Sequence, residues 1–285
     1  MGWNAWQPVT GDGFEFTDIT YKKKFHDELL GGVARIAMNR PHRYNAFTDH
    51  SQDEIFRALY DANQDPMIGV VLLTGEGDHF CTGGDVEWEK AGLRHTVYWG
   101  TIPNRLLRVS RKPLIAVIKG YCIGAGNHLA YCCDFSIAAD NAIFGQNGPR
   151  VSSPADGYVI QHLVRVVGAK RAREMWMLCR RYSASEALEM GLVNRVVPVA
   201  KLDDEVDRWC EDLLQSSPGC IEVLKASFDW ELDTMPPAGV IANTLYPGWF
   251  DSSEGKEGST AFLEKRKPNF WAIRKAEVER RQKPD

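Results

Sequence analysis

Apolar residues along this chain fall into short runs, separated by longer stretches with a helical repeat. Short apolar runs bounded by polar or glycine residues are typical of strands buried on both faces. They predict strands at Val33–Met38, Val70–Thr74, Leu114–Ile118 and Phe135–Ala139. Ile55, Leu59 and Ala62 recur at helical spacing and predict a helix over Ser51–Asn63, and another helix is expected after Gly124. Strands that alternate with helices predict an α/β fold.

The pattern changes after Tyr182, where strands give way to helices. Ser183 followed by Glu186 is typical of a capped helix start, and further helices are predicted near Asp203–Leu214 and Ile221–Leu232. We therefore expect an N-terminal arm, a β/α core and a C-terminal helical region, over residues 1–13, 14–200 and 201–285. The charged tail from residue 265 onward is either solvated or crosses to another subunit.

Two glycine-rich turns each follow a predicted strand: His79–Asp85 (HFCTGGD) and Gly120–His128 (GYCIGAGNH). Small residues let backbone N–H groups approach a ligand closely. Two such turns facing each other would supply two N–H donors to one oxygen, which is an oxyanion hole. Alternatively, each glycine closes a tight strand–helix connection. The occurrence of two turns in register with two strands favours the oxyanion hole.

The segments FCTGGD, GYCIGAGNHLAYCCD and FGQNGPR, with the NRP of Asn39–Pro41 and the NAF of Asn45–Phe47, resemble the crotonase (enoyl-CoA hydratase/isomerase) superfamily. The resemblance covers residues 14–267. It is closest to 1,4-dihydroxy-2-naphthoyl-CoA synthase and 2-ketocyclohexanecarboxyl-CoA hydrolase, through residues 137–146, 172–176 and 262–268. It implies a crotonase-type spiral of ββα units, a C-terminal helical oligomerisation region and a homotrimer or homohexamer acting on an acyl-CoA.

Composition narrows the class of protein. A net charge of −4 shows no basic excess, so nucleic acid is not an expected partner. The seven cysteines form no paired framework and are expected to be free thiols of a cytoplasmic protein. No metal-ligand spacing, secretory leader or long apolar span is present in the sequence, so neither a metal nor a membrane is expected.

The resemblance assigns the oxyanion hole to the backbone N–H groups of Gly84 and Ala125. Ala125 replaces a more usual glycine, but a methyl group leaves the N–H in place. Hydratases of the superfamily use two glutamates to handle one water. Those positions hold His128 and Gly148 here, which disfavours ordinary hydration.

The comparison with the naphthoate synthases is mixed. Gln146, Gly148 and Trp176 match positions that hold a bicarbonate base in the bicarbonate-dependent members, and Ser153 matches a catalytic serine. Bicarbonate is therefore a candidate co-catalyst, and no tightly bound cofactor is expected besides the coenzyme A of the substrate.

Two other synthase positions depart from the family. The catalytic aspartate falls on Ala155 and the C-terminal tyrosine on Phe250. A one-residue slip would bring Asp156 into the place of the aspartate, and Tyr246 lies one helical turn before Phe250. These departures, with a shorter loop after Asp85, weigh against a ring-closing synthase.

His128 and Asp156 form a candidate acid/base pair. The PADG of Pro154–Gly157 resembles a segment of the β-diketone hydrolases of this superfamily, which use histidine and aspartate to add water to a carbonyl. Asp156 would deprotonate water or hold His128 in its productive tautomer. Alternatively, Asp156 caps a helix that begins at Tyr158, and His128 is a hydrogen-bonded core residue.

Candidate CoA-binding residues come from the same resemblance. Arg43 and Lys265 are the expected cations for the phosphates, and Lys265 matches a family lysine contributed by a neighbouring subunit. The family's own basic residue aligns with Tyr44 rather than Arg43. The remaining residues assigned to the CoA site are Ala46, Thr82 and Gly83, and the aromatic residues expected to line the acyl pocket or to pack on the protein body are Trp88, Tyr98 and Trp99.

The sequence therefore favours a hydrolase that cleaves a carbon–carbon bond in a cyclic β-ketoacyl-CoA. Ring closure by a naphthoate-synthase-like reaction is the first alternative, and enoyl-CoA hydration or isomerisation is a weaker one. A catalytically silent CoA-binding subunit is a further hypothesis, against which the intact glycine turns argue.

Overall fold

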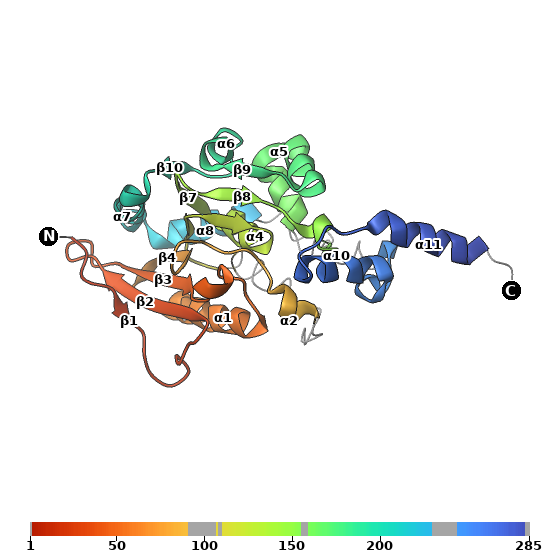
Figure 1. The fold of residues 1–285 in the computed structure, drawn as a ribbon. Coiled ribbons are helices and arrows are strands. Elements are labelled where there is room, and N and C mark those ends of the chain that lie inside the picture. Colours follow the sequence, from red (N-terminus) through yellow and green to blue (C-terminus); the bar gives the residue numbers. More distant parts are fainter. Residues whose placement is uncertain (1, 91–106, 108–109, 155–158, 230–243, 283–285) are drawn as a thin grey trace.

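The computed structural model describes residues 2–90, 107, 110–154, 159–229 and 244–282 (Figure 1). Its centre is a seven-stranded sheet in the order β1-β2-β3-β4-β5-β7-β10. The strands are β1 (Gln7–Pro8), β2 (Ile19–Phe25), β3 (Gly32–Met38), β4 (Ile68–Gly75), β5 (Leu114–Ile118), β7 (Phe135–Ala139) and β10 (Arg195–Val197). Strands β1 to β3 pair antiparallel, and the sheet is parallel from β3 to β10.

A second, smaller sheet lies beside the first. Its strands are β6 (Tyr121–Ile123), β8 (Ile143–Gly145) and β9 (Arg181–Ser183), with β6 and β8 parallel and β9 antiparallel to β8. The backbone of Cys81, in the first glycine-rich turn, forms an isolated parallel β-bridge with Cys122 in β6, and both cysteines are free thiols. The turn that follows β4 is therefore tied to the small sheet, from which the second glycine-rich turn emerges.

Helices cover both faces of the large sheet. They are α1 (Asp49–Gln64), α2 (Val86–Lys90), α4 (Ala125–Tyr131), α5 (Val159–Leu178), α6 (Ala184–Glu189), α7 (Leu202–Leu214), α8 (Pro218–Asp229), α10 (Ser253–Leu263) and α11 (Phe270–Gln282). Helix α10 contacts α2, whereas α11 extends away from the body at the C-terminal end (Figure 1). Within the described residues, no helix combines the length and apolar character needed to cross a membrane.

Burial on both faces explains why the strands read as apolar runs. Along β5, Ala116 and Ile118 face a core packed by α1, α4 and α5, whereas Ile115 and Val117 face a second core closed by α7. Successive side chains of a strand point to opposite faces, so both sets must be apolar when both faces are covered. The parallel part of the sheet thus fixes the carboxyl ends of β4 and β5, which precede the two glycine-rich turns.

The predicted elements correspond closely to observed ones. The four predicted strands are β3, β4, β5 and β7, and the predicted helices are α1, α4, α6, α7 and α8. Ser183 accepts a hydrogen bond from the Glu186 N–H while the Glu186 side chain accepts one from the Ser183 N–H, which is the expected capping box. The apolar pattern does not predict β2, β10 or the small sheet, because their strands are short or carry several polar residues.

The segment expected to form an N-terminal arm, residues 1–13, contributes an edge strand and packs on the sheet over its described part, residues 2–13. Strand β1 adds an antiparallel edge to β2. The Trp3 indole donates to Glu211 of α7 at 3.0 Å, and its ring lies 4.5 Å from the Lys24 ammonium group. Trp3 and Trp6 pack against the core under α7. The aromatic residues hold this segment because their rings bury apolar area and also offer a polar partner.

We predict that Trp3→Ala lowers the free energy of unfolding by about 1–3 kcal/mol, because it removes a half-buried ring, a hydrogen bond and a cation–π contact. Urea denaturation measures the change. Trp271→Ala is the matched control, because Trp271 is 78% exposed and should change stability by no more than about 0.5 kcal/mol. Equal effects of the two substitutions would contradict the packing described for Trp3.

Candidate active site

A cavity of about 900 Å³ opens between the two glycine-rich turns, α2, the segment before α5 and the end of α10. This volume is in the range of small-molecule and cofactor sites. The structure brings together at this cavity every sequence-predicted site residue that it describes: Arg43, Tyr44, Ala46, Thr82, Gly83, Gly84, Ala125, His128, Gln146, Gly148, Ser153, Trp176 and Lys265. Asp156 lies outside the described residues.

The backbone around Gly84 leaves one N–H group free. The Phe47 N–H donates to the Gly83 carbonyl at 2.9 Å, and the Asp85 N–H donates to the Phe47 carbonyl at 2.9 Å. Gly84 is therefore the bridged residue opposite Phe47, and its own N–H points away from that pairing. No described residue accepts a hydrogen bond from the Gly84 N–H.

The second free N–H belongs to Ala125, the first residue of α4. The first-turn N–H groups of a helix have no acceptor within the helix, and no described residue accepts from this one. The turn before it needs glycine, because Gly124 has φ +58°. A Cβ on Gly83 would lie 2.9 Å from the Ala125 nitrogen, so the two turns are in backbone contact. Gly84 and Ala125 thus offer two neighbouring donors, as an oxyanion hole requires.

His128 is held by neutral partners rather than by a carboxylate among the described residues. Its Nε2 lies 3.0 Å from the Gln146 side-chain oxygen, and its ring stacks on Trp176 at 5.2 Å between centroids. Because the amide oxygen only accepts, Nε2 carries the proton and Nδ1 keeps its lone pair. Burial lowers the pKa of His128 to about 4, against a smaller opposing effect of the Gln146 hydrogen bond. The imidazole is therefore neutral near pH 7 and able to accept a proton.

Two buried side-chain donors have no partner among the described residues. They are the side-chain nitrogen of Gln146 and the indole nitrogen of Trp176. Leaving a buried donor unpaired costs about 1–3 kcal/mol, so such groups are uncommon unless a ligand completes them. Their presence beside His128 indicates that this end of the cavity receives an oxygen-bearing group.

Position 148 has no room for a side chain. A Cβ on Gly148 would lie 2.5 Å from the Ser153 carbonyl oxygen and 3.2 Å from the Trp176 ring. The Ser153 N–H also donates to the Gly148 carbonyl at 3.0 Å, which fixes this close approach. The second glutamate of a hydratase would not fit here without a shift of the backbone. The packing around Gly148 therefore excludes a glutamate at this position.

The C-terminal region closes the cavity from within the same chain. The Ser152 hydroxyl donates to the Glu254 carbonyl at 2.7 Å and accepts from the Gly258 N–H at 3.1 Å, which docks α10 beside Ser153. Lys265 follows α10 and lines this cavity. Within one chain, α10 therefore places Lys265 at this cavity, and its supply by a neighbouring subunit stays a prediction.

Other predicted residues differ in their placement. Tyr246 is 55% exposed, packs edge-to-face against Trp249 and does not line the cavity, so it does not replace the missing tyrosine. The side chain of Phe250 is not described, and Ala155, Tyr98, Trp99 and Tyr158 lie outside the described residues. Trp88 lines the cavity, as expected if the aromatic residues after Asp85 line the acyl pocket rather than pack on the protein body.

Beside the cavity, where Tyr44 and Tyr121 line it, aromatic side chains meet in a cluster that the sequence pattern does not predict. Tyr121 stacks on His79 at 4.7 Å, and Tyr44 lies 5.1 Å from the same ring. The exposed Arg43 forms an ion pair with Glu87 at 2.9 Å. Their spacing in the sequence gives no sign of this cluster, because it joins three separate segments. No group of three His, Cys, Asp or Glu side chains among the described residues is arranged to hold a metal ion.

A sequence model of the enoyl-CoA hydratase/isomerase family matches residues 28–272, and the chain therefore belongs to this family, the crotonase-type acyl-CoA enzymes. It is similar to the enoyl-CoA hydratase of Mycobacterium avium subsp. paratuberculosis K-10, with 26% identity and a TM-score of 0.74, over 93% of this chain and 97% of that one.

Two further solved structures share the fold. The enoyl-CoA hydratase of Bacillus anthracis has 28% identity and a TM-score of 0.69, over 89% of this chain and 98% of that one. A methylmalonyl-CoA decarboxylase in complex with 2-nitronate-propionyl-CoA has 24% identity and a TM-score of 0.76, over 93% and 98%. Because one fold supports many reactions, the reaction must be argued from the residues of the cavity.

We predict that Gly84→Pro lowers turnover at least about a hundredfold, because it removes one oxyanion donor. Gly84→Ala is the matched control, since it keeps the N–H and its Cβ would meet only the flexible end of the Glu89 side chain. Steady-state kinetics, with circular dichroism to verify folding, measure both. A folded proline variant with near-normal turnover would exclude this N–H from the reaction.

The lowered pKa of His128 predicts an unusual pH profile. A base must be unprotonated to act, so kcat/KM should stay level from pH 8 to about 5 and fall only as the pH approaches 4. The unfolded state has the ordinary histidine pKa of about 6.5 and binds the proton first, so stability should also decline as the pH falls from there to about 4. An activity limb near pH 6.5 would show that His128 is not the group that titrates.

Proposed function

We propose that this protein hydrolyses a carbon–carbon bond in a cyclic β-ketoacyl-CoA and opens the ring. The observation that carries the proposal is the presence of two separate pairs of unpaired donors in one cavity. One pair is the N–H groups of Gly84 and Ala125, and the other is the side-chain nitrogens of Gln146 and Trp176. Reactions that develop negative charge on two oxygens need two such sites.

The ring-opening reaction develops charge on two oxygens in turn. Water adds to the ring ketone carbon, and the ketone oxygen becomes an oxyanion that Gln146 and Trp176 would stabilise. The bond between that carbon and the α-carbon of the thioester then breaks. Its electron pair moves into a thioester enolate held by Gly84 and Ala125. Protonation of the α-carbon gives an open-chain dicarboxylate mono-thioester, so the net change is the addition of one water.

His128 is the proposed base for the attacking water. Its neutral imidazole has an unprotonated Nδ1 because Nε2 bonds the Gln146 oxygen, and the proton that it takes from water is the one needed at the α-carbon. Asp156 remains a second proposed acid/base group from the sequence. Ser153 lines the cavity next to this end and is proposed as an auxiliary donor. In this arrangement Gln146 serves both the base and the oxyanion.

Ordinary enoyl-CoA hydration is less well supported by the same residues. It would need two carboxylates around one water, and position 128 holds histidine while position 148 has no space for a side chain. A catalytically silent subunit is also disfavoured, because it would have no need to leave the buried Gln146 and Trp176 nitrogens without a partner among the described residues.

A ring-closing, naphthoate-synthase-like reaction is the second candidate. The unpaired nitrogens of Gln146 and Trp176, beside Gly148, are donors that suit a small oxyanion such as bicarbonate. Bound there, bicarbonate would supply a base for enolate formation. Ring closure is the chemical reverse of ring opening, so both reactions use the Gly84 and Ala125 donors.

The remaining parts of the proposal concern binding and assembly. Arg43 and Lys265 would hold the CoA phosphates, with Tyr44, Ala46, Thr82 and Gly83 around the CoA chain. We also propose a homotrimer or homohexamer. Its support is the apolar face of α8, where Val223 is 65% and Phe228 70% exposed.

Product masses distinguish the two reactions. Incubation with 2-ketocyclohexanecarboxyl-CoA should give a product heavier by one water, whereas o-succinylbenzoyl-CoA should be unchanged. Loss of one water from the second compound would identify the synthase instead. No turnover of either compound would contradict both candidates.

We further predict that His128→Ala and Asp156→Asn each slow ring opening by about two to four orders of magnitude, the usual contribution of positioned acid/base groups. The double variant should be no slower than about the worse single variant, because groups acting as a unit are not additive. Wild-type activity should not respond to added bicarbonate. A bicarbonate-dependent rate with both variants active would favour the synthase.

A further inference from the structure

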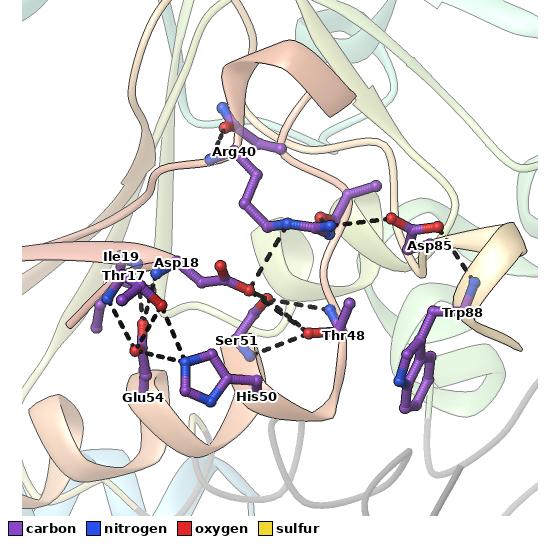
Figure 2. Close-up of polar contacts among 12 residues, drawn as sticks. Thr17, Asp18, Ile19, Arg40, Thr48, His50, Ser51, Glu54, Asp85 and Trp88 are labelled. Atoms are coloured by element: carbon purple, nitrogen blue, oxygen red, sulfur yellow. Dashed lines mark hydrogen bonds and ion pairs between the residues drawn. The ribbon is translucent and has the colours of Figure 1, made fainter. Parts of the chain in front are cut away.

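One arginine connects the segments on both sides of the Gly84 turn. The Arg40 guanidinium donates to the Ala46 carbonyl at 2.5 Å through Nη1 and to the Asp85 carboxylate at 3.1 Å through Nη2. Its Nε lies 3.6 Å from the carboxylate of Asp18. Figure 2 shows this side chain between Asp18 and Asp85. Arg40 does not line the cavity, so it does not touch the substrate.

Each partner of Arg40 is itself fixed to backbone or to a helix start. The Asp85 carboxylate accepts the N–H groups of Glu87 and Trp88, at 3.1 and 3.4 Å, and so caps α2. The Asp18 carboxylate accepts the Ser51 hydroxyl at 2.5 Å at the start of α1 (Figure 2). The guanidinium therefore joins two helix starts and one loop carbonyl.

The Arg40 contacts with Ala46 and Asp85 lie on either side of the backbone β-bridge between Phe47 and Gly84. Ala46 precedes Phe47 on one segment, and Asp85 follows Gly84 on the other. Any separation of the two segments would rotate the Gly84 peptide, whose N–H has no other anchor among the described residues. We propose that Arg40 is a positioning residue of the oxyanion hole, holding the Gly84 N–H toward the cavity. This inference rests on the oxyanion hole of the proposed function.

The geometry needs arginine rather than any cation. A guanidinium is a planar fork with several donors in fixed directions, whereas an ammonium is a single point charge. Lysine at position 40 would not reach a carbonyl and two carboxylates at once. The Arg40 and Asp85 side chains are only 17% and 9% exposed, so solvent would not replace a lost donor well.

The test measures the oxyanion hole directly, without depending on the reaction. Acetyl-CoA with a ¹³C carbonyl is bound to the full-length protein, and the carbonyl stretching band is followed by isotope-edited infrared spectroscopy. Donors at the thioester oxygen weaken the C=O bond and move the band to lower wavenumber. Arg40→Lys should lose at least about half of that shift while still binding acetyl-CoA within about threefold of wild type.

The matched control is Arg35→Lys. Arg35 donates to Glu76 at 2.7 Å, and the two side chains are 21% and 29% exposed, but this pair has no contact with the Gly84 turn. It should leave the carbonyl band unchanged. On a substrate that is turned over, Arg40→Lys should lower kcat about 10- to 100-fold with little change in KM, the effect of a misplaced catalytic group.

The possible outcomes separate this inference from the proposed function. If wild type shows no shift of the carbonyl band, the oxyanion hole is absent and both proposals fall. If wild type shows the shift and folded Arg40→Lys keeps it, only the positioning role is overturned. Asp85→Asn tests the same contact from the other side and decides the matter if Arg40→Lys does not fold. It should reduce the shift, and an unchanged band would overturn the inference.

Discussion

The backbone contact between the two glycine-rich turns is the constraint from which the site is built. Gly126, in the first turn of α4, lies against the Cys81 carbonyl so closely that no side chain would fit between them. Cys81 also pairs with Tyr121 and Ile123 through two backbone hydrogen bonds of 3.0 Å. Because the two turns meet backbone to backbone, the free N–H groups of Gly84 and Ala125 are neighbours. Two donors at one oxygen are what a thioester enolate requires.

Neutral polar side chains, those of His128, Gln146 and Trp176, line the other end of the same cavity. His128 is paired with an amide and stacked on an indole, and burial outweighs the Gln146 hydrogen bond and lowers its pKa to about 4. Gln146 and Trp176 add donors without adding charge. This environment suits oxygens that become negative during the reaction and a base that begins neutral. A pair of glutamates, as a hydratase uses, would give the opposite electrostatic character.

The C-terminal region contributes to the site through one residue of unusual conformation. Ser152 has φ +56°, and in that conformation its hydroxyl and carbonyl both bond the region around α10, including the Trp249 indole at 2.8 Å. Ser152 directly precedes Ser153 at the cavity. Docking of α10 and the shape of the cavity are therefore coupled, which explains how a helix so far along the chain comes to line it.

Local sequence patterns predict the class of fold and most of the residues that meet at the cavity. Strands buried on both faces read as apolar runs, and glycines that close a turn are visible in the local sequence, because both signals are set by near neighbours. They could not place β6, β8 and β9, which have three residues each and are stable only through pairing with one another. Nor could they reveal that residues 2–13 pack on the sheet. The direction of the Gly84 N–H, the low pKa of His128 and the position of Lys265 at the cavity follow only from the tertiary structure. These properties arise from contacts between segments far apart in sequence, and local patterns carry no record of such contacts.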